Sequence, residues 1–197
     1  MANVLAPRQR WRVEFEGEAN HAGTTAMRDR RDALLPAARF VLAVDEVARA
    51  HEDAVGTVGR VEVHPGSTNS IPGHVALSLD VRALDVATVD AMVAELQDRF
   101  GEAVFSRESQ DEGAAFDAGL RESLLAAAAQ RGIPAGDLPS FAGHDAGILA
   151  PVRPSAMLFV RNPTGASHTP AESASESDCV AAAQVLTDAL LTELAAE

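Results

Sequence analysis

The sequence contains a single cysteine, Cys179, among its 197 residues. One thiol cannot form a disulfide within the chain, and it cannot supply the thiolate cluster of a structural zinc site. The sequence also lacks an apolar run of the roughly 18 residues that a membrane-spanning helix requires. Its first residues do not combine a basic start with a long apolar stretch. We therefore expect a cytoplasmic protein that neither crosses nor binds a membrane.

Basic residues are scarce as well. The chain has 16 Lys and Arg against 29 Asp and Glu, which gives a formal net charge of -13 and a pI near 4.8. Nucleic-acid phosphates are bound by clustered basic side chains, and no such cluster is present. These features exclude nucleic acid as an expected partner, and a small anionic substrate would have to be bound by a local arginine.

A regular hydrophobic pattern runs from about residue 8 to residue 110. Trp11, Val13 and Phe15 alternate with charged residues, which predicts a strand with one buried face. Asp32 is the predicted N-cap of a helix that follows. The apolar stripe of this helix comprises Leu34, Ala37, Val41, Val44 and Ala48.

Two strands are then predicted over 57–63 and 75–81, joined by a turn rich in Pro and Gly at 65–73. A short apolar run at 103–105 predicts a fourth strand. Between the strands at 75–81 and 103–105, a second amphipathic helix is predicted, with an apolar side made of Val89, Met92, Val93, Leu96 and Phe100. The order β-α-β-β-α-β predicts an α+β ferredoxin-like domain over 8–110, with a four-stranded antiparallel sheet and two helices.

The pattern changes near residue 111, and residues 111–197 predict part of an α/β domain. A helix around 120–128 precedes the continuous apolar run 156–160, which is typical of a strand covered on both faces. A last helix begins at about Ser177, with an apolar side made of Val180, Val185, Leu186, Ala189 and Leu190. These few helices and strands would leave sheet edges and apolar helix faces uncovered. We therefore expect this region to dock onto other polypeptide.

Two stretches place a histidine in a turn of small and polar residues. His21 lies in NHAGTT at 20–25, and His168 lies in GASHTPAE at 165–172. A side chain in such a turn can face a cleft instead of packing into a core. Both histidines are therefore candidates for functional residues. The alternative for His168 is a loop histidine that caps a helix or contacts solvent, and the alternative for His21 is an exposed loop histidine.

Further motifs occur in the same order along the chain: RDAL at 31–34, NSIPG at 69–73, DVR at 80–82 and GHDA at 143–146. With the two histidine turns, they resemble a family of zinc-dependent amidohydrolases that includes N-carbamoyl-L-amino acid hydrolases, allantoate amidohydrolases and β-ureidopropionases. The resemblance covers nearly the entire chain. It implies that 8–110 form a lid, also used for homodimerisation, and that 111–197 form the C-terminal part of a catalytic domain.

The resemblance also implies roles for individual residues. His168 corresponds to a zinc ligand, and His21 corresponds to the lid histidine that stabilises an oxyanion in the neighbouring subunit's site. Asn69 and Arg82 correspond to a clamp for the substrate carboxylate, for which a planar guanidinium is well suited. The helix N-terminus at His144 corresponds to a contact for a substrate oxygen.

The alternative for Arg82 is a structural role, in which a strand-end arginine pairs with Asp80 or Asp85. The chain also departs from the family pattern, because Ala26 replaces the usual Pro after Thr-Thr and Phe141 replaces a Gly. The second change would narrow the substrate pocket.

Complete enzymes of the family contain zinc or manganese, and catalytic zinc takes about three protein ligands plus water. Only His168 qualifies in this sequence. The family's adjacent Glu-Glu pair, which supplies a ligand and the general base, has no counterpart, since no Glu-Glu dipeptide occurs. We therefore expect this chain alone to bind metal weakly and to be inactive without a separate chain that carries the N-terminal catalytic half.

Three functions follow from these observations. The first is the lid and C-terminal segment of an amidohydrolase that cleaves the C–N bond of an N-carbamoyl amino acid or ureido acid. The second is a non-catalytic module for dimerisation or ligand binding that derives from this family. The third is a fragment of a related dipeptidase or aminoacylase.

Overall fold

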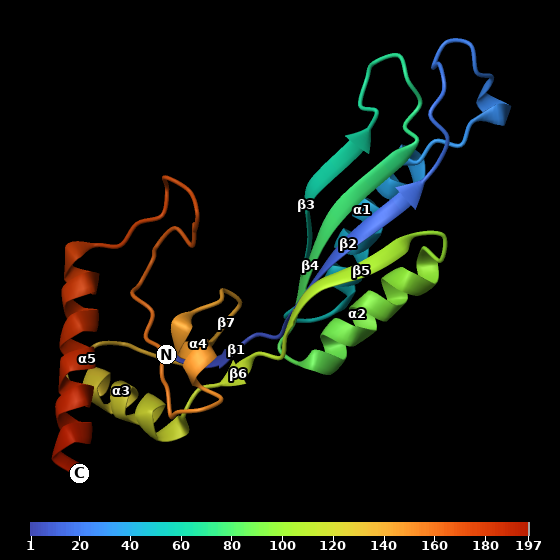
Figure 1. Cartoon of the computed structure of the whole chain (residues 1–197). Coiled ribbons are helices and arrows are strands. Elements are labelled where there is room, and N and C mark those ends of the chain that lie inside the picture. Colours follow the sequence, from blue (N-terminus) through green and yellow to red (C-terminus); the bar gives the residue numbers. More distant parts are fainter. Residues whose placement is uncertain (197) are drawn as a thin grey trace. The chain divides into compact units, whose positions relative to one another are not determined.

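The computed structural model describes residues 1–196, and the chain divides into two compact units. The central unit comprises residues 6–112, and the terminal unit combines Met1–Leu5 with the chain from Gly113 onward (Figure 1). Strand β1 (Ala2–Leu5) therefore belongs with the C-terminal part of the sequence. The sequence pattern predicted no element there, because so short a strand has no measurable periodicity.

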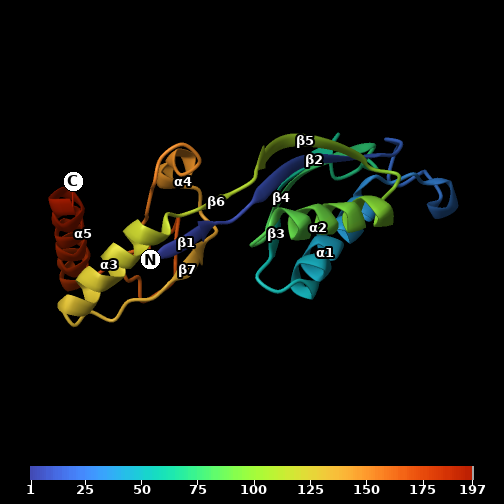
Figure 2. The same cartoon turned by 90° about the horizontal axis from the view of Figure 1, so that it is seen from below.

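The central unit confirms the predicted element order and the four-stranded antiparallel sheet. Its sheet has the strand order β3-β4-β2-β5. Both helices cover one face of this sheet and leave the other face open (Figure 2). The elements are β2 (Arg8–Glu16), η1 (Met27–Asp29), α1 (Leu34–Ala50), β3 (Val55–His64), β4 (His74–Arg82), α2 (Val86–Arg99) and β5 (Val104–Asp111).

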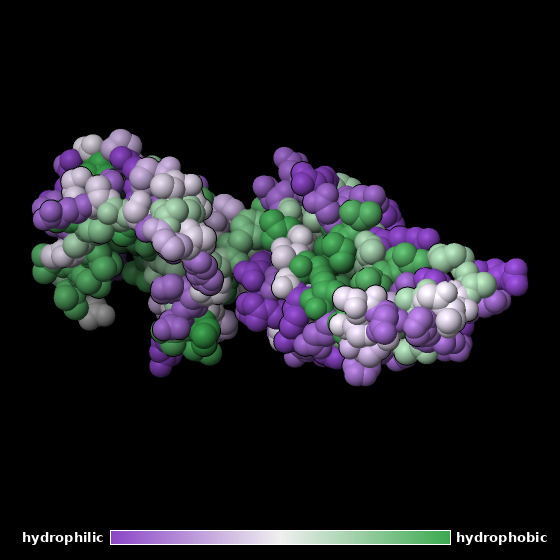
Figure 3. All heavy atoms as spheres, turned by 90° about the horizontal axis from the view of Figure 1, so that it is seen from above, coloured by the Kyte–Doolittle hydropathy of each residue, from purple (hydrophilic) through white to green (hydrophobic). Residues whose placement is uncertain are grey.

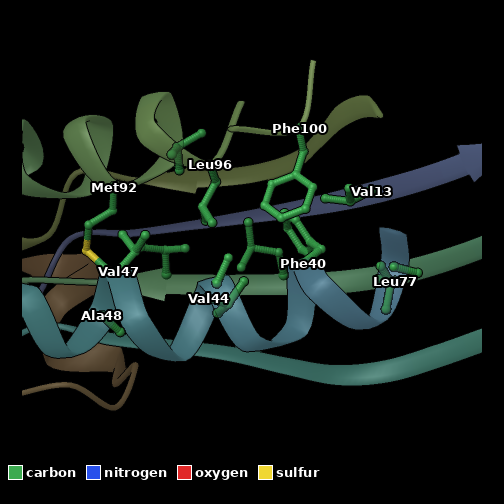
Figure 4. Packing of buried hydrophobic residues seen from close by; sticks show 14 of the residues in the cluster. Val13, Phe40, Val44, Val47, Ala48, Leu77, Met92, Leu96 and Phe100 are labelled. Carbon is green, nitrogen blue, oxygen red and sulfur yellow. The ribbon is translucent and has the colours of Figure 1, made fainter. Parts of the chain in front are cut away.

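The core of the central unit lies between the sheet and the two helices. Residues 75, 77, 79 and 81 of β4 are buried against the helices, and the residues between them lie on the open face. Phe40 of α1 is completely buried, with its ring 5.2 Å from that of Phe100 and 5.8 Å from that of Phe105. Figure 4 shows Phe40, Val44 and Val47 facing Met92, Leu96 and Phe100. Burial of each such side chain contributes about 1.5–3 kcal/mol.

The start and the buried stripe of α1 differ from the prediction. The N-cap is Ala33, and Asp32 instead accepts a hydrogen bond at Oδ1 from the backbone N–H of Leu34. Leu34 and Val41 are 37% and 38% exposed, and the core positions are taken by Ala37, Phe40, Ala43, Val44, Val47 and Ala48. The helix is rotated so that the large ring of Phe40 fills the core, which the spacing of aliphatic residues alone did not indicate.

The terminal unit has a small sheet of short strands in the order β6-β1-β7, with β1–β6 antiparallel and β1–β7 parallel. Helix α3 packs against α5 through Leu124 and Ala128 on one side and Val185 and Ala189 on the other. The elements besides β1 are β6 (Ala114–Ala115), α3 (Ala118–Gln130), β7 (Leu138–Ser140), α4 (Asp145–Leu149) and α5 (Glu176–Ala196).

Two predictions for the terminal unit are wrong. Residues 156–160 do not form a strand: the backbone carbonyl of Met157 accepts a bond from Ala2, but Phe159 and Val160 are 43% and 37% exposed. On α5, only Val185 and Ala189 of the predicted apolar side are buried, and Val180, Leu186 and Leu190 are exposed. A strand buried on both faces needs neighbouring strands in its sheet and layers packed on both sides, and the described part of this unit does not supply them for residues 156–160.

None of the described helices combines the length and the apolar character needed to cross a membrane.

Candidate functional site

The two loops at one end of the central sheet are joined by backbone hydrogen bonds. The loop after β2 and the loop before β4 are linked by Gly17 N to Gly73 O, Ala22 N to Asn69 O and Ile71 N to Asn20 O, each 2.8 Å long. Residues His21 and Ser70 also form an isolated β-bridge. The structure therefore brings His21 and Asn69 together, although 48 positions separate them in the sequence.

The imidazole of His21 has a defined orientation. Its Nδ1 accepts hydrogen bonds from the backbone N–H groups of Gly23 at 3.0 Å and Thr24 at 3.2 Å. A nitrogen that accepts two N–H bonds cannot itself carry a proton, so the neutral ring carries its hydrogen on Nε2. The residue is exposed. The loop thus presents an N–H donor to the surface.

Arg30 stabilises the turn that carries His21, a role that the sequence motifs did not indicate. Its Nε donates to the carbonyl of Thr25 at 3.1 Å, and its Nη2 donates to the carbonyl of Ala22 at 2.5 Å. Both carbonyls belong to the turn that carries His21. The signal in the sequence was an arginine within ten residues of the histidine motif, but its partners are backbone groups, which leave no mark in the sequence.

Asn69 has a structural hydrogen bond in its own loop. Its Oδ1 accepts a bond from the hydroxyl of Ser67 at 3.0 Å, while its backbone carbonyl accepts the bond from Ala22. The same Ser67 hydroxyl lies 2.9 Å from the hydroxyl of Ser70. The side chain of Asn69 is thereby oriented next to the turn that carries His21.

Arg82 lies at the other end of the sheet. It is the last residue of β4, a strand of nine residues that begins at His74 beside the paired loops. At about 3.3 Å per residue, the two ends of β4 are about 26 Å apart. Within one copy of the chain, Asn69 and Arg82 therefore cannot bind the same carboxylate.

Asp80 holds the guanidinium of Arg82 in place. Arg82 donates from Nε to Oδ1 at 2.6 Å and from Nη2 to Oδ2 at 3.1 Å, and Arg10 Nε donates to Oδ2 at 2.8 Å. Burial raises the pKa of the Asp80 carboxyl, but these hydrogen bonds outweigh it, so the pKa lies below its ordinary value of 3.8. The alternative predicted from the sequence, a pairing of Arg82 with Asp80, is therefore present.

His144 opens helix α4, as predicted. It occupies the N-cap position, and its Nδ1 accepts a hydrogen bond from the N–H of Ala146 at 3.0 Å. Its carbonyl accepts a bond from the N–H of Gly147. These two N–H groups at the start of α4 are thus bonded to His144 itself.

His168 lies in an exposed loop that is ordered by Glu172. The backbone of His168 has a φ of 58°, a left-handed conformation that is uncommon for residues other than glycine. Its N–H donates to Glu172 Oε2 at 2.9 Å. Among residues 1–196, no three His, Cys, Asp or Glu side chains are grouped so that they could hold a metal ion. The donor set of this chain alone therefore does not fit a catalytic metal.

A groove of about 520 Å³ lies in the terminal unit, and none of the predicted site residues lines it. Its walls come from the end of α3, the first part of α5 and the segment 158–165. Most of the lining side chains are apolar, and they include Leu158, Phe159 and Val160. The run that was predicted to be a buried strand thus forms part of an open wall.

Comparison with known proteins gives a consistent family. The family model described as peptidase family M20/M25/M40 matches residues 14–192. An N-carbamoyl-L-amino acid amidohydrolase of Geobacillus stearothermophilus is 38% identical over 178 residues, which cover 86% of this chain and 44% of that protein. A ureidoglycolate hydrolase of Arabidopsis thaliana is 34% identical over 186 residues, which cover 89% of this chain and 39% of that protein.

Solved structures agree with this result. The crystal structure of an amidase of the hydantoinase/carbamoylase family from Burkholderia vietnamiensis matches with a TM-score of 0.91 and 35% identity, over 97% of this chain and 48% of that one. Allantoate amidohydrolases are also among the relatives, so the resemblance stated from the motifs is confirmed. The chain spans about half the length of the relatives it matches, or less. It belongs to the peptidase family M20/M25/M40.

Proposed function

We propose that this chain supplies the lid and the C-terminal catalytic segment of an amidohydrolase that cleaves the C–N bond of an N-carbamoyl amino acid or ureido acid. The names of the relatives support this substrate class. Their identities of 30% or more extend over most of this chain. The remaining half of their length corresponds to polypeptide that would contribute the rest of the site.

The observation that carries the proposal is the orientation of His21. Two backbone N–H groups fix its Nδ1 as an acceptor, so Nε2–H is the group available to a substrate. A preorganised N–H donor stabilises the negative charge that develops on a carbonyl oxygen during attack on an amide, typically by about 3–4 kcal/mol. His21 is proposed to donate this bond.

The central unit is proposed to be a ferredoxin-like lid that also forms a homodimer. Strand β3 is an edge strand, so one side of its backbone has no neighbour in the sheet. Beside it, α1 exposes Leu35 and Leu42, which are 55% and 65% accessible, and β3 exposes Val61. Figure 3 shows apolar residues gathered on this unit. Two copies joined through β3 and α1 would pair the open edges and cover these side chains.

A dimer would also resolve the separation of Asn69 from Arg82. Arg82 ends β4, and Asn69 lies in the loop before its first residue, so the strand length of about 26 Å separates them. We propose that each site takes His21 and Asn69 from one copy and Arg82 from the other. Arg82 would bind the substrate carboxylate, and Asp80 would hold its guanidinium in plane.

The family implies zinc or manganese, yet His168 is the only ligand that the motifs place in this chain. The described residues contain no cluster for a metal, so no step of the proposal passes through a metal held by this chain alone. We propose that a separate polypeptide with the remaining ligands completes the centre and that His168 joins it there. His144 is proposed to contact the substrate with its Nε2–H.

Complementation tests the proposal. The chain would be mixed with a polypeptide that carries the remaining part of an N-carbamoyl-L-amino acid amidohydrolase, in the presence of zinc or manganese, and ammonia release from N-carbamoyl-L-alanine would be measured. We expect turnover only in the mixture. The variant His21→Ala should lower the rate about 100-fold or more, and His51→Ala, a histidine of the same unit outside the loops, should not change it.

The second candidate is a non-catalytic dimerisation or ligand-binding module, for which the exposed apolar side chains of α1 and the edge strand β3 would be sufficient. An inert mixture in which both polypeptides are folded would support this candidate over the first. Turnover by the purified chain alone would contradict both.

A further inference from the structure

Arg8 lies beside Arg82 on the open face of the central sheet. Between Arg8 and Arg10, the buried side chain of Gln9 points toward the helices, where its Nε2 donates to Asp90 of α2 at 2.6 Å. Side chains alternate along a strand, so Arg8 and Arg10 point to the other face. In the ladder between β2 and β4, Arg8 is directly opposite Arg82.

The guanidinium of Arg8 lacks the hydrogen bonds that its neighbours have. Arg10 and Arg82 both donate from Nε to Asp80. For Arg8, the carboxylate of Asp111 lies 3.8 Å from Nη2, which is longer than a hydrogen bond. The Nε of Arg8 is shielded from solvent and has no hydrogen-bond partner in the part of the chain that the structure describes.

This arrangement is unfavourable without a further anion. A shielded donor of a charged group without an acceptor carries a desolvation penalty. Two like charges directly opposite each other on neighbouring strands also repel. Asp80 and Asp111 offset part of this charge, but neither accepts a bond from the Nε of Arg8. A second anionic group bound between the side chains of Arg8 and Arg82 would supply the missing acceptor.

We infer that Arg8 binds a second carboxylate of the substrate, and that this chain therefore selects dicarboxylic N-carbamoyl amino acids. The inference rests on the proposed function, in which Arg82 binds the first carboxylate. Side chains directly opposite each other on antiparallel strands have Cβ atoms about 4.5–5.5 Å apart. This spacing suits two carboxylates separated by two or three carbon atoms, as in the derivatives of aspartate and glutamate.

Binding measured on the chain itself tests the inference. N-carbamoyl-L-aspartate and N-carbamoyl-L-alanine would be titrated at equal ionic strength, while NMR follows the Nε–Hε signals of Arg8 and Arg82. We expect both compounds to shift the Arg82 signal, and only the aspartate derivative to shift that of Arg8. The aspartate derivative should bind about tenfold more tightly, which corresponds to about 1.4 kcal/mol.

Two variants complete the test. Arg8→Gln should reduce the affinity for the aspartate derivative to that for the alanine derivative. Arg60→Gln removes an arginine of β3 that lies in register with Ser78 on the same open face, and it should preserve the tenfold preference. If the preference survives Arg8→Gln, the inference is wrong.

The outcomes separate the inference from the proposal on which it rests. If both compounds shift the Arg82 signal and bind equally well, Arg8 has no such role and the role of Arg82 stands. If neither compound shifts the Arg82 signal, the proposed carboxylate site is wrong and the inference fails with it.

Discussion

Gly17 is the residue at which the paired loops of the candidate site are most sensitive to substitution. A Cβ added at this position would lie 2.2 Å from the carbonyl oxygen of Arg31 and 2.7 Å from the backbone nitrogen of Ala33. Both neighbours are backbone atoms, so the chain itself would have to move. We expect Gly17→Ala to destabilise the pairing of the loops by about 2 kcal/mol, in the range of overpacking substitutions.

Two backbone bonds report directly on this region. The N–H of Glu18 donates to Arg31 O at 2.7 Å, and the N–H of Ala33 donates to Pro72 O at 3.0 Å. A loss of about 2 kcal/mol corresponds to a roughly 30-fold larger population of the open state, and therefore to roughly 30-fold faster amide exchange. Amide hydrogen exchange followed by NMR should show this acceleration at both groups in Gly17→Ala.

Gly101 provides the matched control, because a Cβ at this position meets no atom within 4 Å. Gly101→Ala should leave the two exchange rates within about twofold of wild type, because a compatible glycine replacement acts mainly on the unfolded chain. If Gly17→Ala exchanges no faster than Gly101→Ala at these amides, the close packing of the two loops is wrong.

Three further substitutions probe other parts of the account. Asp80→Asn should lower the free energy of unfolding by about 1–2 kcal/mol at pH 7, because it removes the negative charge and one of the two oxygens that accept the arginine bonds. Since the pKa of Asp80 is lowered in the folded state, its contribution to stability is present above the unfolded pKa of 3.8 and is lost as the pH falls through the lowered folded pKa. In urea denaturation, the difference in unfolding free energy between wild type and variant should therefore be smaller at pH 3 than at pH 7. An equal difference at both pH values would contradict this. Phe40→Ala should cost about 3–5 kcal/mol in the same assay because it leaves a cavity among packed rings, and a loss under 1 kcal/mol would be incompatible with its complete burial. Leu42→Asp should shift the chain from dimer to monomer in sedimentation velocity at micromolar concentration, since it places a charge in the proposed apolar interface; an unchanged dimer would exclude this face of α1.

The element order and the four-stranded sheet of the central unit could be predicted from the sequence. Strand β4 buries its alternating apolar residues 75, 77, 79 and 81 against the helices, as its period of two predicts. Helix α2 likewise buries all four of its predicted core residues within the helix. Helix α1 was harder, because small alanines on two sides leave the buried stripe uncertain until the ring of Phe40 is placed.

The terminal unit was predicted less well for a physical reason. A continuous apolar run such as 156–160 indicates burial, but it forms a strand only where neighbouring strands are present. Strand β1 was missed because its partners, β6 and β7, lie more than 100 residues away in the sequence. Local patterns carry no information about such pairings.

The candidate site was predicted as a set of residues, but its geometry was not. Motif order identified His21, Asn69 and Arg82, whereas only the register of β4 reveals that Arg82 lies at the far end of the sheet. The closure of the His21 turn by Arg30 depends on backbone carbonyls, which any residue supplies. Neither the place of Arg82 nor the bonds of Arg30 can be deduced from the sequence pattern alone.

The claim that one site draws residues from two copies can be measured directly by mixing inactive variants. In the complemented protein, His21→Ala and Arg82→Gln would be prepared separately and then combined in equal amounts under conditions that allow subunit exchange. Half of the dimers would be mixed, and each mixed dimer would have one intact site, so we expect about a quarter of the wild-type rate of N-carbamoyl-L-alanine hydrolysis. A mixture as inactive as either variant alone, alongside an active wild-type control, would contradict the account.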